Sequence, residues 1–119
     1  MTGAVTLYGI PNCDTIKKAR NWLQAQAIEY RFHDYRKQGV DGDQLLSMAQ
    51  QLGWEVMLNR RGTTWRALPD PVKAKIDQTS ALLLMQDNPA IIKRPILERD
   101  GRFYIGFNPP QYQEIFTPA

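Results

Sequence analysis

The feature that most constrains this chain is a strand-to-helix transition near its start, built around one cysteine. Val5-Thr6-Leu7-Tyr8 is an apolar, β-branched run that predicts a buried strand over Ala4 to Tyr8. The following Gly-Ile-Pro-Asn segment is typical of a turn and a helix start, and Asn12 is placed to cap the helix. Cys13 is then expected in the first helical turn.

A cysteine at a helix start has altered acid chemistry. The unpaired N–H groups and the positive end of the helix dipole favour a negative charge there. A thiol in this position loses its proton more easily, and the thiolate is the nucleophile. Cys13 is the only cysteine in the sequence, so an internal disulfide is excluded. The pattern predicts a thiol-redox active site, and an inert buried thiol is the structural alternative.

Length and charge narrow the class of protein. A chain of 119 residues is long enough for one domain with a core. The net charge of +3 is mild and the basic residues form no block, so we expect no nucleic-acid partner. The sequence has no run of about 20 apolar residues and no secretory leader, so we expect no membrane contact and a cytoplasmic location. We also expect a monomer without a metal site, because one Cys and one His offer no ligand spacing.

The first forty residues are predicted to form a β-α-β unit. From Asp14 onward, Ile16, Ala19, Leu23 and Ala27 recur at helical spacing. Apolar and polar residues alternate from Ile28 to Tyr35, which predicts a second strand. The two strands should be parallel, with a right-handed connection.

Residues 40–90 are predicted to be a helical insertion. Asp41-Gly42-Asp43-Gln44 offers a capping box for a helix that Gly53 ends. The pattern of Trp54 to Leu58 is compatible with a helical turn or a loop. Asn59 to Arg66 is polar and basic, which indicates a loop.

Two further short helices complete the predicted insertion. Asp70-Pro71 is a helix start, with the proline in the first helical position and the helix covering Val72 to Gln78. Thr79 or Ser80 is expected to cap a helix over Ala81 to Gln86, which ends near Asn88-Pro89.

The last quarter predicts a hairpin and a final helix. Two β runs, Lys93 to Arg99 and Arg102 to Phe107, are separated by Asp100-Gly101, a strong local hairpin signal. Asn108-Pro109 starts a helix with an apolar stripe of Tyr112, Ile115 and Phe116. The order of elements predicts a mixed α/β sheet of four strands.

Two segments, Ile10 to Ala19 and Lys93 to Leu97, together resemble the arsenate reductase (ArsC)/Spx family, and the order of elements that joins them agrees with it. Leu58 to Arg66 and the ending Gly106-Phe107-Asn108 are most similar to the YffB branch. The resemblance covers essentially the whole chain and implies one domain over residues 1–119. It implies a thioredoxin-like, four-stranded mixed sheet with a helical insertion at about residues 40–90.

The resemblance also implies roles for individual residues. Cys13 matches the nucleophilic cysteine of the family, and Arg94 matches an active-site arginine beside it. Pro95 matches the cis-proline whose turn presents backbone groups to a bound thiol compound. Arg60 or Arg61 matches a further arginine of the site.

Two departures from the family pattern bear on activity. Gly106-Phe107-Asn108 stands where arsenate reductases of the family carry another arginine, which disfavours arsenate as substrate. Ile16 stands where the Spx regulators carry the second cysteine of a Cys-x-x-Cys switch.

What remains is a single-cysteine thiol reductase, as the resemblance to the YffB branch implies. It would use glutathione as thiol co-substrate, with no bound cofactor, and reduce disulfides or mixed disulfides through a mixed-disulfide intermediate. The carboxylates of glutathione are expected to meet cationic and polar groups of the site. The candidate residues are Asn12, Lys17, Arg60, Arg61, Arg94 and Pro95. The alternatives are a Spx-like transcription adaptor without enzymatic activity and an arsenate reductase.

Overall fold

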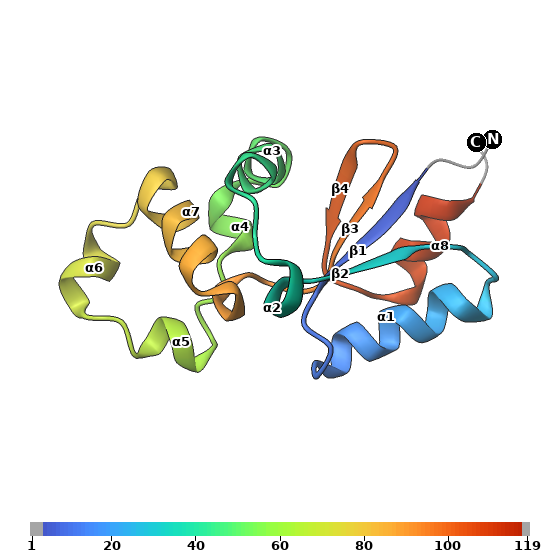
Figure 1. Ribbon diagram of the computed structural model, residues 1–119, viewed down its shortest axis with the longest axis horizontal. Coiled ribbons are helices and arrows are strands. Elements are labelled where there is room, and N and C mark those ends of the chain that lie inside the picture. Colours follow the sequence, from blue (N-terminus) through green and yellow to red (C-terminus); the bar gives the residue numbers. More distant parts are fainter. Residues whose placement is uncertain (1–3, 118–119) are drawn as a thin grey trace. The chain divides into compact units, whose positions relative to one another are not determined.

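The computed structural model of the protein describes residues 4–117. They form two compact units, which are described separately. The first contains residues 4–33 and 94–117, and the second contains Asp34–Lys93. Figure 1 shows a sheet with two helices in the first unit and a group of short helices in the second.

The first unit is built on a four-stranded mixed sheet. Its strands are β1 (Val5–Gly9), β2 (Arg31–Asp34), β3 (Ile96–Arg99) and β4 (Arg102–Ile105), in the order β2-β1-β3-β4. β1 pairs antiparallel with β3, and β3 pairs antiparallel with β4. β2 lies beside β1, and the two run in the same direction (Figure 1). The predicted thioredoxin-like α/β fold is confirmed.

The hairpin between β3 and β4 forms where the sequence predicts it. Asp100 and Gly101 both have positive φ angles, 54° and 80°. A two-residue turn of this conformation matches the right-handed twist of the strands, and glycine and aspartate tolerate it well.

The core of the first unit lies between one face of the sheet and two helices, α1 (Asp14–Ala25) and α8 (Pro109–Phe116). Leu7 and Leu97 from the strands meet Ala19 and Leu23 from α1 in this core. Tyr112 of α8 completes it, with its ring edge-on to Phe107 at 4.7 Å between centroids. Both helical predictions are therefore confirmed, including Asn108 as the residue that caps α8.

The second strand is shorter than predicted. The sequence alternates from Ile28 to Tyr35, but only Arg31–Asp34 are extended in the sheet. Tyr35 begins a helical turn, α2 (Tyr35–Gln38), because the carboxylate of Asp34 accepts a hydrogen bond from the N–H of Arg36. A local cap thus ends the strand that the alternation would have continued.

The second unit is made of short helices, as predicted for residues 40–90. After α2 these are α3 (Gly42–Leu52), α4 (Trp54–Met57), α5 (Thr63–Arg66), α6 (Asp70–Ala74), α7 (Gln78–Asp87) and the 3₁₀ turn η1 (Pro89–Ile91). Trp54 to Leu58 is thus largely helical. The predicted loop over residues 59–66 is wrong in its second half, since Gly62 leads into one helical turn.

Helix boundaries in this unit differ from the predictions for local reasons. Asp41 is the N-cap of α3 as predicted, but its side chain accepts no capping hydrogen bond, so the capping box is absent. Asp41 is exposed, and water competes for its carboxylate. Helix α6 begins at Asp70 and ends at Ala74, so Pro71 is in its second position rather than its first.

The cap of α7 is also displaced from the predicted one. Asp77 caps the helix, rather than Thr79 or Ser80. The spacing of Asp77 and Ser80 allows a reciprocal box, in which each side chain accepts from the backbone N–H of the other. The helix therefore begins earlier than predicted, although it ends before Asn88 as expected. Across residues 4–117, none of the helices has the length and apolar character that a bilayer span requires.

Candidate active site

The cysteine lies where the first strand gives way to the first helix. Cys13 has extended backbone angles, φ −118° and ψ 128°, and is the N-cap of α1. The expectation that Asn12 caps the helix is wrong by one residue, because Pro11-Asn12 form the turn that precedes it. The Cys13 side chain makes no conventional capping hydrogen bond, but the backbone N–H groups of Ile16 and Thr15 in the first turn of α1 act on its thiol.

The register of the sheet brings a second segment to the same place. Tyr8 in β1 is paired with Ile96 in β3, and the two strands are antiparallel. The residues that follow β1 therefore lie beside those that precede β3, which are Arg94 and Pro95. The Arg94–Pro95 peptide bond is cis, as the resemblance implied. The carbonyl of Pro95 accepts a hydrogen bond of 2.9 Å from the N–H of Gly106.

The pKa of the Cys13 thiol is lowered from its ordinary value by these surroundings. Partial burial alone would raise it, because desolvation disfavours the thiolate. Hydrogen bonds from the backbone N–H of Ile16, the side chain of Arg94 and the backbone N–H of Thr15 outweigh that effect. The positive charge of Arg94 lowers the pKa further. Cys13 is half-buried rather than sealed in the core.

The predicted residues near the cysteine fall into two groups. Arg94 interacts directly with the thiol, whereas Asn12 and Lys17 have exposed side chains on either side of Cys13 in the sequence. Lys17 contributes its backbone to the first helical turn, where its N–H donates to the carbonyl of Cys13 at 3.0 Å. Lys17 is the fourth residue of α1, and the assignment of its side chain to the thiol site stays a prediction.

Arg60 and Arg61 belong to the second unit. With Glu55, Leu58 and Lys93 they line a pocket of about 240 Å³ in that unit. The guanidinium of Arg60 lies 5.5 Å from the ring centroid of Trp65, and the N–H of Arg61 donates to the side chain of Asn59 at 3.1 Å. Both arginine side chains are exposed. Their assignment to the thiol site stays a prediction.

Two contributors to the site were not singled out from the sequence. The backbone N–H groups of Thr15 and Ile16 act on the sulfur because they are the second and third residues of α1. Such positions follow directly once the N-cap is fixed at Cys13. The signal was therefore present in the sequence, but it depended on a helix boundary that was misplaced by one residue.

Comparison with known proteins identifies the family. The model of the ArsC family matches residues 8–115, which include the end of β1, the cysteine, the cis-proline segment and all of β2, β3 and β4. The chain belongs to the ArsC family.

Solved structures place this ArsC-family chain close to two proteins. It is 44% identical to a YffB protein, with a TM-score of 0.92, and the match covers 96% of this chain and 100% of that one. It is 50% identical to an arsenate reductase (ArsC) related protein from Brucella melitensis, with a TM-score of 0.76 and coverage of 97% and 96%. The predicted resemblance to the family and to YffB is confirmed.

Curated relatives include one near neighbour and one more distant branch. The chain is 49% identical to an uncharacterised protein of Haemophilus influenzae, over 95% of this chain and 99% of the relative. It is 28% identical to the global transcriptional regulator Spx of Streptococcus pyogenes, over 95% of this chain and 85% of that protein. Cys13 is the one cysteine in the sequence of this ArsC-family chain, and it is a free thiol. The residue three positions after it is Ile16.

Proposed function

We propose that this protein is a glutathione-dependent thiol reductase in which Cys13 is the nucleophile. The observation that carries the proposal is the lowered pKa of a half-buried thiol that interacts with Arg94 and with the N–H groups of Ile16 and Thr15. A thiolate held in this way is ready to attack a disulfide. Membership of the ArsC family supports the same chemistry.

The reaction requires two exchange steps, because the chain has a single cysteine. The Cys13 thiolate attacks the glutathione sulfur of a glutathionylated thiol, which forms a new S–S bond and breaks the old one. The released thiolate takes a proton from solvent and leaves as a thiol. Reduced glutathione then attacks the mixed disulfide at Cys13 and releases oxidised glutathione. The cysteine regains its thiolate, and the proton of the attacking glutathione thiol goes to solvent. The net reaction converts the glutathionylated thiol and one reduced glutathione into the free thiol and oxidised glutathione.

The groups around the thiol suit an anionic tripeptide. Glutathione carries two carboxylates, and the positive charge of Arg94 acts on Cys13. Lys17, exposed in the fourth position of α1, is a further proposed partner. Asn12 offers an amide, and the polar backbone group that Pro95 offers at the turn before β3 is its carbonyl, which also accepts from Gly106. Arg60 and Arg61 are the proposed partners from the second unit.

A coupled assay tests this proposal. We expect the natural chain to reduce the mixed disulfide of glutathione and a small thiol, with consumption of reduced glutathione. Cys13→Ser should lose that activity entirely. Intact mass after incubation with oxidised glutathione should show one adduct at Cys13 that reduced glutathione removes. Absence of the adduct, or equal activity in Cys13→Ser, contradicts the proposal.

A Spx-like adaptor is the second candidate, favoured by the 28% identity to that regulator over most of the chain. An adaptor binds a transcription component through its surface and needs no thiol chemistry. Its partner should be retained by Cys13→Ser, whereas the reductase loses its activity. The third candidate, arsenate reduction, is tested by measuring whether added arsenate causes the protein to oxidise a supplied thiol. We expect no such oxidation, because Gly106-Phe107-Asn108 lacks the additional arginine of the arsenate reductases.

A further inference from the structure

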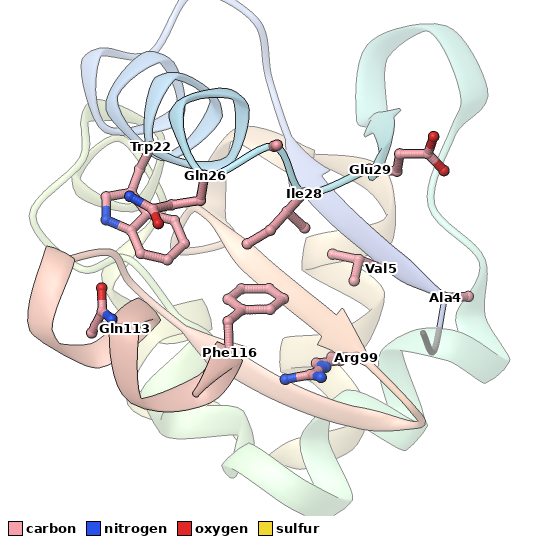
Figure 2. Close-up of a pocket in the computed structure, with 10 residues that line it drawn as sticks. Ala4, Val5, Trp22, Gln26, Ile28, Glu29, Arg99, Gln113 and Phe116 are labelled. Carbon is pink, nitrogen blue, oxygen red and sulfur yellow. The ribbon is translucent and has the colours of Figure 1, made fainter. Parts of the chain in front are cut away.

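The first unit contains a second candidate ligand site, at the opposite end of α1 from the cysteine. A pocket of about 640 Å³ lies between the start of β1, the end of α1, the residues that follow it, and α8. Figure 2 shows its lining residues. Cys13 precedes the first residue of α1, whereas Gln26 of the pocket follows its last, and a 12-residue helix is about 18 Å long. The pocket is therefore separate from the thiol site.

The walls of this pocket combine aromatic and aliphatic side chains. Trp22 and Phe116 lie side by side, with 5.9 Å between their ring centroids and 33° between their planes. Ile28 and Val5 form the facing wall (Figure 2). The volume is within the range of small-molecule sites, and the apolar surface suits a flat or branched hydrocarbon body.

A positive charge is fixed against these walls. Arg99 of β3 points into the pocket in Figure 2, and its side chain is 30% exposed. Its Cζ atom lies 4.9 Å from the centroid of the Phe116 ring, and its Nη1 donates to the carbonyl of Ile115. These contacts order the guanidinium before any ligand arrives, which reduces the entropy lost on binding.

The same arginine keeps donors for a ligand. Asp100 approaches it only at Nε, at 3.8 Å, which is a long and exposed pairing. Among residues 4–117, Nη2 of Arg99 has no partner. A planar guanidinium with a free edge next to a ring face is suited to a carboxylate.

The remaining polar groups lie at the rim. Gln26 and Gln113 have exposed amides, and Glu29 is exposed as well. The carboxylate of Glu29 is directed away from the apolar walls in Figure 2. The charge that faces the interior of the pocket is therefore the positive charge of Arg99.

We infer that this pocket binds a small carboxylate with an apolar, ring-bearing body. The carboxylate pairs with Arg99, and the body packs on Trp22, Phe116 and Ile28. This site goes beyond the proposed reductase function, and it is independent of it because none of its groups touches Cys13.

Titration with a matched pair of probes tests the inference. 3-Phenylpropanoate and its neutral amide, 3-phenylpropanamide, are added separately to the full-length protein and followed by ¹H–¹⁵N correlation spectra. We expect saturable shifts of the Trp22 indole N–H and the Ile28 amide, with the acid bound about tenfold more tightly than the amide, as a charge-assisted hydrogen bond provides. Equal affinities for acid and amide, or shifts of the acid that do not saturate, overturn the inference.

Variants locate the charge that is responsible. Arg99→Gln should reduce the affinity for the acid to that for the amide, whereas Arg102→Gln should leave it unchanged. Arg102 is the matched control because it is exposed and is the direct cross-strand partner of Arg99. An unchanged affinity in a folded Arg99→Gln variant contradicts the inference, and if that variant does not fold, the comparison of acid and amide on the natural chain decides.

The site is also distinguished from the thiol site in one experiment. Saturating 3-phenylpropanoate should leave the rate at which iodoacetamide alkylates Cys13 unchanged within twofold. Protection of Cys13 by the acid, together with shifts that cluster at Cys13 and Arg94, would assign the binding to the thiol site and refute a second pocket. Failure here leaves the reductase proposal standing, because that proposal is tested by Cys13→Ser.

Discussion

Gly9 and Ile16 are in such close contact that no other residue fits at position 9 without movement. A Cβ atom built at Gly9 would lie 2.2 Å from Cδ1 and 3.0 Å from Cγ1 of Ile16. Ile16 is fully buried, so its side chain has little room to move away. Because Gly9 has no side chain, Ile16 can pack against it, and the first turn of α1 keeps its position. The N–H of Ile16, which stabilises the Cys13 thiolate, belongs to that turn.

Gly9→Ala should therefore damage both stability and thiol chemistry. We expect a loss of about 1–3 kcal/mol in the free energy of unfolding, as overpacking of a core usually costs. Alkylation of Cys13 near neutral pH should be slower as well. Chemical denaturation and alkylation rates measure the two effects. Gly42→Ala is the control, since a Cβ there meets only side-chain atoms at 3.5 Å or more, and equal results for the two variants would contradict the argument.

Arg94→Gln should raise the pKa of Cys13, because it removes a positive charge and a hydrogen bond that favour the thiolate. At a fixed pH below that pKa, the thiolate fraction falls and alkylation slows, by on the order of fivefold. Iodoacetamide rates over a pH series measure this. Arg102→Gln removes an exposed arginine of β4 and should leave the profile in place. An unchanged pH profile in Arg94→Gln would show that Arg94 does not act on the Cys13 thiol.

Removal of the hydroxyl should have different effects on the stability of the protein at two buried tyrosines, Tyr112 and Tyr8. Burial raises the pKa of Tyr112, and within residues 4–117 its hydroxyl has no hydrogen-bond partner. Tyr112→Phe should thus be neutral or stabilising by up to about 1 kcal/mol. The hydroxyl of Tyr8 donates to Glu98 at 2.7 Å, so Tyr8→Phe should cost about 1 kcal/mol. Urea unfolding of both variants checks this, and a larger loss for Tyr112→Phe would show that its hydroxyl has a partner.

The cap of α7 should make stability depend on pH in the acid range. Hydrogen bonds from the N–H and hydroxyl of Ser80 hold the pKa of Asp77 below its usual value. The folded state therefore binds this proton less well than the unfolded state, and the stabilisation is present above the unfolded pKa and is lost as pH falls through the folded pKa. Asp77→Asn should lower the melting temperature at pH 7 by a few degrees and reduce the loss on acidification. Thr79→Ala should change neither, and the reverse result would move the cap to Thr79.

Much of the fold follows from patterns that the sequence displays locally. The spacing of Ile16, Ala19 and Leu23 predicts α1, and Asp100-Gly101 between two β runs predicts the hairpin, because each pattern depends on neighbours in the chain. Helix starts were less predictable. Asn12, Thr79 and Ser80 have capping side chains, but Cys13 and Asp77 are the N-caps, since the actual choice depends on which backbone N–H each side chain meets.

The site needed information that local patterns do not contain. Cys13 and Arg94 are far apart in the sequence, and they meet because Tyr8 pairs with Ile96 in antiparallel strands. Only the resemblance to a known family indicated that pairing and the cis bond before Pro95. The pocket at Arg99 had no sequence signal, because its lining comes from four separate segments whose residues look like ordinary core and surface positions.

The central claim is that Cys13 is held as an accessible thiolate, and its pH titration tests this most directly. The rate of alkylation by iodoacetamide is measured against pH for the natural chain and for N-acetylcysteine amide in the same buffer. The account predicts that the midpoint for Cys13 lies below that of the free thiol, since Arg94 and the N–H groups of Ile16 and Thr15 lower its pKa. A midpoint at or above that of the free thiol, or no alkylation of the folded protein, would contradict it.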